Sequence, residues 1–325
     1  MHKKVLVTGS SGFIGSHLCT YLVAQGYYTV GLDIQSCQIS DKQSDFVLCD
    51  ILDREKLTYT IRKYQPEVIV HLAARTDLNE KNTLQGYAVN IEGTENLVAA
   101  IKDNDCVERV LFTSSQLVCD VKYAPKNDTD YRPPNLYGES KVLTEKIVRS
   151  SDLEDVTWCI LRPTTIWGEG MSPHYQNFLR LVQIGRFFHI SSRPLYKSYG
   201  YIGNTTYQYK RFIEAPSTNI HKQTFYIADY KPLSLREWTN CLADELSDRP
   251  LKTVPVPVAK LLAYIGDGLN TVGMKKFPFN SFRLKNILTE YMFDLSSTEK
   301  ICGPLPFSMK EGVQRTAQWF QSMQS

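Results

Sequence analysis

The first half of the chain alternates short apolar runs with stretches in which apolar residues recur at helical spacing. Runs of this kind are typical of buried strands, and the spacing is typical of helices that cover a sheet. The pattern predicts an α/β fold with a parallel sheet and helices on both faces. The expected strands are residues 3–7, 27–32, 46–49, 68–72, 107–113 and 157–161, and the expected helices lie near residues 53–64, 86–102 and 137–149.

The pattern loosens after Pro163, where Gly168, Gly170 and Pro173 indicate a loop. Beyond it we expect irregular, aromatic-rich sequence with helices near residues 174–185, 234–246 and 308–321 and a Pro-Val repeat at residues 254–258. We therefore predict a first domain over residues 1–167, with a returning segment near residues 196–215, and a smaller lobe formed mainly by residues 168–325.

Residues 7–18, VTGSSGFIGSHL, place three glycines between an apolar strand and an apolar helical pattern. Gly9 allows a sharp turn, Gly12 leaves room for a ligand at the backbone, and Gly15 allows the helix to lie close to the sheet. The N-terminus of the helix supplies free N–H groups and the positive end of its dipole, which suit a pyrophosphate. The alternative for this motif by itself is a glycine-rich turn that binds nothing.

The next expected strand ends in Asp33, 18 residues after Gly15. An acid at this spacing is expected to bind the ribose hydroxyls of a dinucleotide. Its charge would repel a 2′-phosphate, and no arginine follows in residues 34–36 to offset that repulsion. We therefore predict a Rossmann-type doubly wound fold whose first domain binds NAD in preference to NADP.

Composition excludes several classes of function. The 37 Lys and Arg residues nearly balance the 34 Asp and Glu residues, and the net charge of +3 is too small and scattered to indicate nucleic acid. The eight cysteines form no CxxC motif or Cys/His cluster, so we expect no metal site and a reducing compartment. The apolar run at residues 254–265 contains two prolines and Lys260 and is shorter than the roughly 20 residues that span a bilayer. With the first strand starting at once, we expect no signal peptide, no membrane span and a cytoplasmic location.

A Tyr/Lys pair supplies the candidate chemistry. Tyr137 and Lys141 are four residues apart near the start of an expected helix, so their side chains project from one face. An adjacent ammonium and a nicotinamide cation both favour a phenolate, which can take or return a proton. An exposed helix face is the alternative for the pair alone. Upstream, Thr113, Ser114 and Ser115 end a strand, where open α/β sheets bind ligands, so Ser115 is a candidate for a hydrogen bond to substrate.

With these motifs in order, the sequence resembles the extended short-chain dehydrogenase/reductases, specifically the NAD-dependent nucleotide-sugar epimerase/dehydratase family. The resemblance covers nearly the whole chain. It is carried by TGSSGFIG at residues 8–15, Asp33, CDI at residues 49–51, HLAA at residues 71–74, Asn90, Ser115, Tyr137, Lys141, LRP at residues 161–163, YMFDLSSTEK at residues 291–300 and SMKEGV at residues 308–313.

The resemblance implies a role for each matching residue. Ser115 would hydrogen-bond the reacting hydroxyl, Tyr137 would act as the acid and base, and Lys141 would bind the nicotinamide ribose and lower the pKa of Tyr137. Asn90 would lie on the cofactor side, or equally would be a buried helix asparagine that bonds the neighbouring strand. The implied cofactor contacts are Gly9, Gly12, Phe13, Ile14, Gly15, Asp33, Asp50, Ile51, Leu72, Ala73, Ala74, Asn90, Tyr137, Lys141, Pro163 and Thr164.

The chain also departs from the family pattern. Sugar 4,6-dehydratases of the family carry Asp-Glu after the catalytic Ser or Thr, where this chain has Gln116 and Leu117. Cys119 and Asp120 replace a Tyr-Gly pair, and residues 202–204, Ile-Gly-Asn, replace the Val-Asp-Asp of a later strand. These changes bear on the substrate and leave hydride transfer intact.

We predict an NAD-dependent nucleotide-sugar epimerase that acts, at C4, through a transient keto intermediate. The alternatives are an NAD-dependent hydroxyl dehydrogenase or reductase of nucleotide-sugar or steroid type, the latter suggested by VPVPVAKLLAYIG at residues 254–266, and a catalytically silent NAD-sensing protein. We expect a homodimer without a nucleic-acid partner. The expected substrate contacts are Ser115, Gln116, Asn177, Arg180, Arg193 and Arg283, with the arginines available for a diphosphate.

Overall fold

The chain forms two compact units, each assembled from segments that are distant in the sequence. Unit 1 comprises Met1–Ile166, Gly200–Tyr230 and Asp294–Pro306, and unit 2 comprises Trp167–Tyr199, Lys231–Phe293 and Phe307–Ser325. The structure is a computed structural model that describes residues 3–36, 44–78, 80, 82–121, 123–190, 193–247, 249–271 and 279–324. Two short strands, β7 (Thr165–Trp167) and β10 (Tyr199–Tyr201), lie where the chain passes from one unit to the other.

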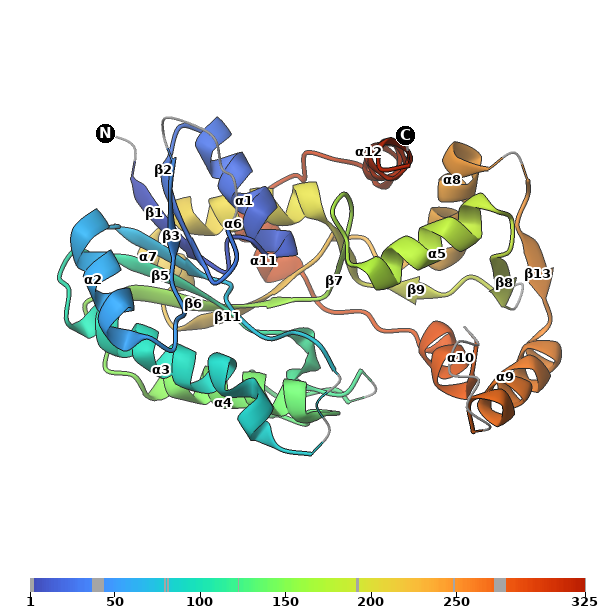
Figure 1. The fold of residues 1–325 in the computed structure, drawn as a ribbon, viewed down its shortest axis with the longest axis horizontal. Coiled ribbons are helices and arrows are strands. Elements are labelled where there is room, and N and C mark those ends of the chain that lie inside the picture. The colour runs from blue at the N-terminus through green and yellow to red at the C-terminus, as the bar shows by residue number, and fades with distance from the viewer. Residues whose placement is uncertain are drawn as a thin grey trace. The chain divides into compact units, whose positions relative to one another are not determined.

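Unit 1 is built on a seven-stranded sheet in which every pair of neighbours is parallel (Figure 1). Strands β1 and β4 lie side by side, with Val5 opposite Val68 and Thr8 opposite His71. The order in which successive strands join the sheet changes side between β1 and β4. Open α/β sheets bind ligands at the carboxyl ends of the two strands that flank such a change. In spatial order the strands are β11 (Gln223–Ile227), β6 (Thr157–Pro163), β5 (Arg109–Thr113), β4 (Val68–His71), β1 (Lys4–Thr8), β2 (Tyr28–Asp33) and β3 (Ser44–Leu48).

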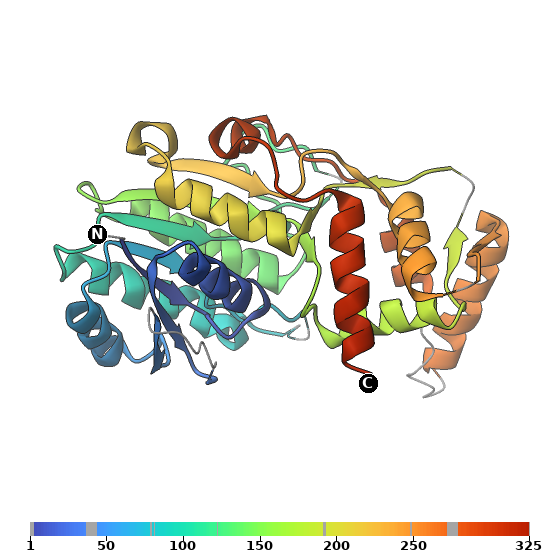
Figure 2. The ribbon, with the colours of Figure 1, turned by 90° about the horizontal axis from the view of Figure 1, so that it is seen from above.

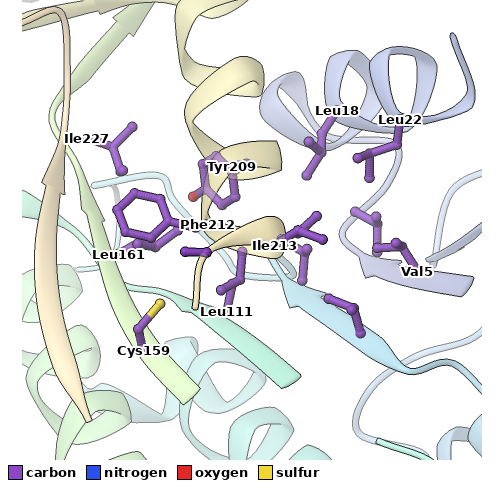
Figure 3. Packing of buried hydrophobic residues seen from close by; sticks show 14 of the residues in the cluster. Val5, Leu18, Leu22, Leu111, Cys159, Leu161, Tyr209, Phe212, Ile213 and Ile227 are labelled. Carbon is purple, nitrogen blue, oxygen red and sulfur yellow. The ribbon is translucent and has the colours of Figure 1, made fainter. Parts of the chain in front are cut away.

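Helices bury both faces of this sheet. In one core, Val5, Leu111 and Leu161 of the strands pack against Leu18 and Phe212 of the helices (Figure 3). Because strand side chains alternate between faces, the neighbouring strand residues enter a second core under the other helices. The first face carries α1 (Phe13–Ala24), α6 (Ile202–Glu214), α7 (Ser217–Ile220) and α11 (Ser296–Cys302), and the second carries α2 (Arg54–Tyr64), α3 (Ala88–Lys102) and α4 (Leu136–Ser150).

Unit 2 has a helical core with short strand pairs. Helix α8 packs beside α12 (Figure 2) and also against α5, and Trp238 of α8 stacks on Phe178 of α5 with ring centroids 5.2 Å apart. None of the helices among the described residues is long and apolar enough to cross a membrane. The elements of this unit are α5 (Pro173–Gln183), β8 (Phe188–Ile190), β9 (Tyr196–Lys197), β12 (Leu233–Ser234), α8 (Leu235–Leu246), β13 (Lys252–Val254), α9 (Val256–Thr271), α10 (Ser281–Leu288) and α12 (Met309–Ser322).

The expected parallel α/β fold is confirmed, whereas two expectations about later segments are wrong. Residues 202–204 begin α6 and do not lie in a strand. No helix was expected at the Pro-Val repeat, yet β13 ends at Val254 and α9 begins at Val256. Pro257 is tolerated there because a first-turn N–H has no partner within its own helix.

Candidate active site

The turn between β1 and α1 depends on its glycines. Gly9 has a φ of +72°, its N–H donates to the Leu32 carbonyl at 2.8 Å, and a Cβ added there would lie 2.6 Å from the Ala73 nitrogen. A side chain at Gly15 would collide with the Gly9 carbonyl oxygen, so glycine lets α1 approach the turn. A Cβ at Gly12 would meet only that same oxygen, at 3.2 Å, and the space around it is otherwise open.

The N-terminus of α1 fits an anionic ligand. Gly12 is its N-cap residue, and no side chain caps the helix, so N–H groups of the first turn remain available as donors. Phe13 and Ile14 follow and are half-buried, with Ile14 packed on the core below the turn. An open glycine backbone beside uncapped helix donors fits the pyrophosphate of a dinucleotide.

Asp33 lies beside the same turn, at the end of β2. One carboxylate oxygen accepts from the Ser11 N–H at 2.9 Å, and the other accepts from the Gln35 N–H at 3.0 Å. Each carboxylate oxygen can accept a second hydrogen bond. The side chain is therefore held in place and keeps acceptor capacity for ribose hydroxyls.

The loops after β3 and β4 complete this edge of the sheet. The Asp50 carboxylate accepts from the Leu52 N–H at 2.9 Å, while Ile51 is buried in the core under α3. The N–H of Leu72 donates to the Thr8 carbonyl, and the N–H of Ala73 donates to the Thr8 hydroxyl. Leu72, Ala73 and Ala74 are all half-buried at the carboxyl end of β4.

Asn90 joins three parts of unit 1 from a fully buried position in α3. Its side-chain oxygen accepts from the Arg75 N–H at 2.7 Å, and its amide donates to the Arg75 carbonyl at 3.1 Å and to the Ser140 hydroxyl at 2.9 Å. These bonds hold the loop after β4 against α4. Asn90 therefore has a structural position directly behind the Tyr/Lys helix.

Ser115 and Tyr137 meet because α4 starts against the turn that follows β5. Ser115 caps the short 3-10 helix Gln116–Val118, and its Oγ accepts from the Leu117 N–H at 3.1 Å. A side chain at Gly138 would collide with the Leu117 carbonyl oxygen, so glycine permits this close approach. The Ser115 hydroxyl lies close to the Tyr137 phenol and favours its phenolate, which lowers the pKa of Tyr137. The sequence analysis did not single out Gly138, although this glycine directly follows Tyr137 in the motif YGESK.

Burial dominates the electrostatics of the Tyr/Lys pair. It raises the pKa of Tyr137 to about 12, and the hydrogen bond from Ser115 opposes this increase. It lowers the pKa of Lys141 to about 8, which Glu145 partly offsets. The ammonium of Lys141 donates to the Thr113 carbonyl at 2.9 Å. We expected Lys141 to lower the pKa of Tyr137. Among the described residues, Lys141 is not one of the groups that shift this pKa.

The other predicted residues near this edge are Gln116, Pro163 and Thr164. Gln116 is buried, and its side-chain oxygen has no hydrogen-bond partner among the described residues. Such an oxygen can accept a hydrogen bond from a hydroxyl of a bound molecule. Pro163 ends β6, and the N–H of Thr164 donates to the Ile227 carbonyl at 3.0 Å.

Sequence reasoning missed an ion pair beneath the site. Glu145 lies one helical turn beyond Lys141, and its carboxylate is 2.7 Å from the guanidinium of Arg162. The Ser114 hydroxyl donates to this carboxylate at 2.6 Å, and the Tyr131 hydroxyl donates to it at 2.9 Å. The signal was the spacing of residues 137, 141 and 145, which places all three on one face of α4.

The four remaining predicted substrate residues lie in unit 2. Asn177 and Arg180 are exposed on α5, and Arg283 is exposed on α10. Arg193 forms an ion pair of 2.7 Å with Glu290. The structure describes these residues within their own unit and does not bring them together with Ser115.

Unit 2 also buries a lysine that the sequence analysis did not single out. The Lys197 ammonium donates to the Asn286 carbonyl at 2.7 Å and lies 5.2 Å from the ring centroid of Tyr291. Burial lowers the pKa of Lys197 to about 8. No carboxylate pairs with it among the described residues. Likewise, the described part of the chain holds no group of His, Cys, Asp and Glu side chains suited to a metal ion.

The fold and the site together define an oxidoreductase of the short-chain dehydrogenase type. The decisive features are the glycine turn before α1, the acid that ends β2, and the Ser/Tyr/Lys set on α4 and the turn after β5. The chain belongs to the NAD dependent epimerase/dehydratase family, whose profile matches residues 5–184. The predictions of the family, the Rossmann-type fold, the enzyme class and the NAD cofactor are thereby confirmed.

Curated relatives match over most of the chain. The identity is 26% over 331 residues to N-acetyl-alpha-D-glucosaminyl-diphospho-ditrans,octacis-undecaprenol 4-epimerase of Escherichia coli O157:H7, covering 98% of this chain and 96% of that protein. It is 30% over 336 residues to UDP-glucose 4-epimerase of Vibrio cholerae, with the same coverage of 98% and 96%. A 3-beta-hydroxysteroid dehydrogenase of Mycolicibacterium neoaurum is 28% identical over 251 residues, covering 72% of this chain and 68% of that protein. The epimerase prediction and its steroid-type alternative thus both have counterparts among the relatives.

Solved structures share the fold over nearly the full length. UDP-glucose 4-epimerase of Thermotoga maritima with UDP-glucose has a TM-score of 0.76 at 19% identity and covers 99% of this chain and 100% of that chain. UDP-glucuronic acid 4-epimerase of Bacillus cereus in complex with NAD has a TM-score of 0.75 at 19% identity and covers 99% of this chain and 100% of that chain. At these identities the likeness establishes the fold.

Proposed function

We propose that the chain is an NAD-dependent nucleotide-sugar 4-epimerase. The observation that carries the proposal is that Ser115, in the turn after β5, lies beside Tyr137 of α4, with Lys141 one turn farther along the same helix. The 4-epimerases among the full-length relatives support it. A protein that only senses NAD would not need a complete Ser/Tyr/Lys set.

The proposed chemistry divides the work among three side chains. Ser115 donates to the Tyr137 oxygen and orients the sugar C4 hydroxyl. The phenolate of Tyr137 takes the proton of that hydroxyl, and the resulting phenol later returns it. NAD, when bound between the β1–α1 turn and α4, supplies the acceptor and donor for the hydride of C4. Lys141, one turn farther along α4, would hold the nicotinamide ribose of bound NAD. The buried side-chain oxygen of Gln116 has no partner among the described residues, and it accepts a hydrogen bond from a further sugar hydroxyl.

The substrate class is proposed from charge. A sugar joined to a diphosphate needs cations, and unit 2 supplies the buried ammonium of Lys197 and the exposed side chains of Arg180 and Arg283. Arg193 already pairs with Glu290 and is a weaker candidate. A steroid has no use for a buried cation, so the sugar diphosphate is favoured over the steroid-type alternative.

A second candidate is a 4-epimerase of sugars linked through diphosphate to a polyprenol. The reaction at C4 is the same, and only the group beyond the diphosphate differs. The full-length relative from Escherichia coli O157:H7, named for a substrate of this kind, favours it.

The test is to incubate the purified protein with NAD and, separately, UDP-glucose, UDP-N-acetylglucosamine and polyprenyl-diphospho-N-acetylglucosamine. We expect one of these to be converted to its C4 epimer, detected by proton NMR, with no change in mass. Gln116 and Leu117 cannot supply the acid and base that dehydration needs, so a product that has lost water would contradict the assignment. Net accumulation of NADH with a ketone product would make the protein a dehydrogenase.

We also propose a cytoplasmic homodimer. None of the seven cysteines among the described residues forms a disulfide, which agrees with a reducing compartment. A shallow hollow on α3 and α4 is lined in part by Ile91, Leu143 and Ile147. The same face of a second copy would cover it under twofold symmetry. Sedimentation velocity should give the mass of two chains, and a monomer at all concentrations would contradict the proposal.

A further inference from the structure

The outward face of α9 is apolar, which is the reverse of an ordinary surface helix. Val258, Leu261, Tyr264 and Ile265 have 47%, 61%, 68% and 48% of their surface exposed. The buried face of the same helix is made of small residues such as Ala259. At 100° per residue, the exposed positions form one continuous stripe along the helix.

Helix α10, which packs against α9, extends this surface and gives it a positive charge. Phe282 is 67% exposed, and Lys260, Arg283 and Lys285 are exposed around the apolar stripe. The one acidic residue in the two helices, Asp267, accepts from the Ser281 N–H that begins α10. The α9–α10 face, defined as Val258, Lys260, Leu261, Tyr264, Ile265, Phe282 and Lys285, therefore combines apolar side chains with cations and no exposed carboxylate.

The stripe is not an unfinished part of the core of unit 2. The inner side of the helix pair already packs, with Ala259, Ala263 and Leu284 against Ile190 of β8. Elsewhere, large exposed apolar side chains such as Tyr59 on α2 are scattered. Single exposed apolar residues are ordinary, whereas a continuous patch marks an interaction surface.

We propose that the α9–α10 face docks on the surface of a membrane that contains anionic lipid. Apolar side chains of a helix lying in the interface enter the acyl boundary, and the flanking cations contact lipid phosphates. A second copy of the chain is a poorer occupant, because a twofold contact would bring Lys260 and Lys285 of one copy against the same cations of the other. Helix α9 has 16 residues and lies on the bilayer without spanning it.

This proposal does not depend on the substrate. Docking would bring the enzyme to a polyprenol-linked sugar if the second candidate reaction holds, and it would equally place a nucleotide-sugar epimerase near enzymes that use its product at the membrane. Membrane binding and epimerase turnover can therefore be measured separately, and either can fail alone.

The experiment is flotation of the full chain with large unilamellar vesicles of phosphatidylcholine alone or mixed with phosphatidylglycerol. We expect the protein to float with the anionic vesicles and to be released by high salt. Leu261→Ser combined with Ile265→Ser should lower the partition coefficient at least about tenfold. Lys285→Gln should weaken binding to anionic vesicles only. The matched controls, Tyr59→Ser and Lys102→Gln on exposed sites of unit 1, should leave binding unchanged.

Circular dichroism and turnover on a soluble nucleotide sugar keep the result interpretable, because neither should change in these variants. Equal flotation of the parent and the Leu261/Ile265 double variant would overturn the proposal. So would a parent that does not bind vesicles. If the double variant instead lowered the mass seen by sedimentation velocity, the face would be a contact between copies, and the membrane assignment would be wrong.

Discussion

The Glu145 carboxylate and the Arg162 guanidinium are 2.7 Å apart, and each side chain is only 1% exposed. Arg162 lies in β6 and Glu145 in α4, so the pair connects a strand of the sheet to the helix that carries Tyr137 and Lys141. Through Ser114, the same carboxylate holds the end of β5 next to Ser115. Glu145 is therefore a positioning residue that acts through Ser114, Arg162 and helix α4.

Glu145→Gln should lower the free energy of unfolding by about 3–5 kcal/mol, because it leaves the buried Arg162 charge without its counter-ion. Glu139→Gln, on the exposed side of the same helix, should change it by less than about 0.5 kcal/mol. Urea unfolding followed by circular dichroism measures both. Equal stability of the two variants would show that the pair does not support the fold.

Tyr137→Phe keeps the ring and removes the group that carries the proton. Turnover should fall by about 100- to 10,000-fold, while the affinity for NAD, measured by calorimetry, should change little. Tyr59→Phe, on the exposed side of α2, is the control for loss of a phenol and should retain full activity. A Tyr137→Phe enzyme with near-parental turnover would remove Tyr137 from the mechanism.

Asp33 should make the protein select NAD over NADP. A 2′-phosphate beside its carboxylate is repelled, and the preference should be on the order of 1–3 kcal/mol. Asp33→Ala should narrow that difference, because it removes the repulsion along with the bond to the Ser11 N–H. The measurement is the dissociation constant of each dinucleotide. Tighter NADP binding by the parent would refute this role.

Lys197 should give the fold a distinctive pH dependence. Burial lowers its pKa from 10.5 to about 8, so between these values the folded chain holds fewer protons than the unfolded chain. The cost of burying the ammonium is fully present below pH 8 and is relieved as pH rises. Relative to Lys197→Met, the parent should therefore gain about 2 kcal/mol of stability between pH 8 and pH 10.

Urea unfolding of the parent and of Lys197→Met at pH 7, 8, 9 and 10 tests this difference, because all other titrations are common to both chains. Lys252→Met, at an exposed lysine of β13, should show no such trend. A difference between parent and Lys197→Met that stays constant with pH would show that burial does not depress the pKa of this lysine.

The sequence alone determined the features that arise from short-range geometry. The strand, glycine turn and helix at residues 4–24 follow from apolar periodicity and from glycine conformations within one stretch of chain. The position of Asp33 follows as well, because the second strand of a strand–turn–helix–strand unit ends beside the turn after the first strand. Tyr137 and Lys141 share a helix face because they are four residues apart.

Two of the helices that the sequence did not reveal, α6 and α9, have unusual faces. The buried side of α6 includes Asn204, Thr205 and Gln208, so its polar residues obscure the helical period. Helix α9 has apolar residues on its exposed side and prolines near its start. These features together obscure the helical pattern in the sequence. In both cases tertiary packing, and not the hydrophobic pattern, decides the structure.

The relations between distant residues were decided only in three dimensions. The partners Glu145 and Arg162 lie on different elements, and either could have been an ordinary surface charge. The same holds for Lys197, whose burial depends on α10 and Tyr291. Burial also set the direction of the Tyr137 pKa, which the sequence had placed under the control of Lys141. Desolvation depends on every neighbour of a group, and neighbours are chosen by the fold rather than by spacing along the chain.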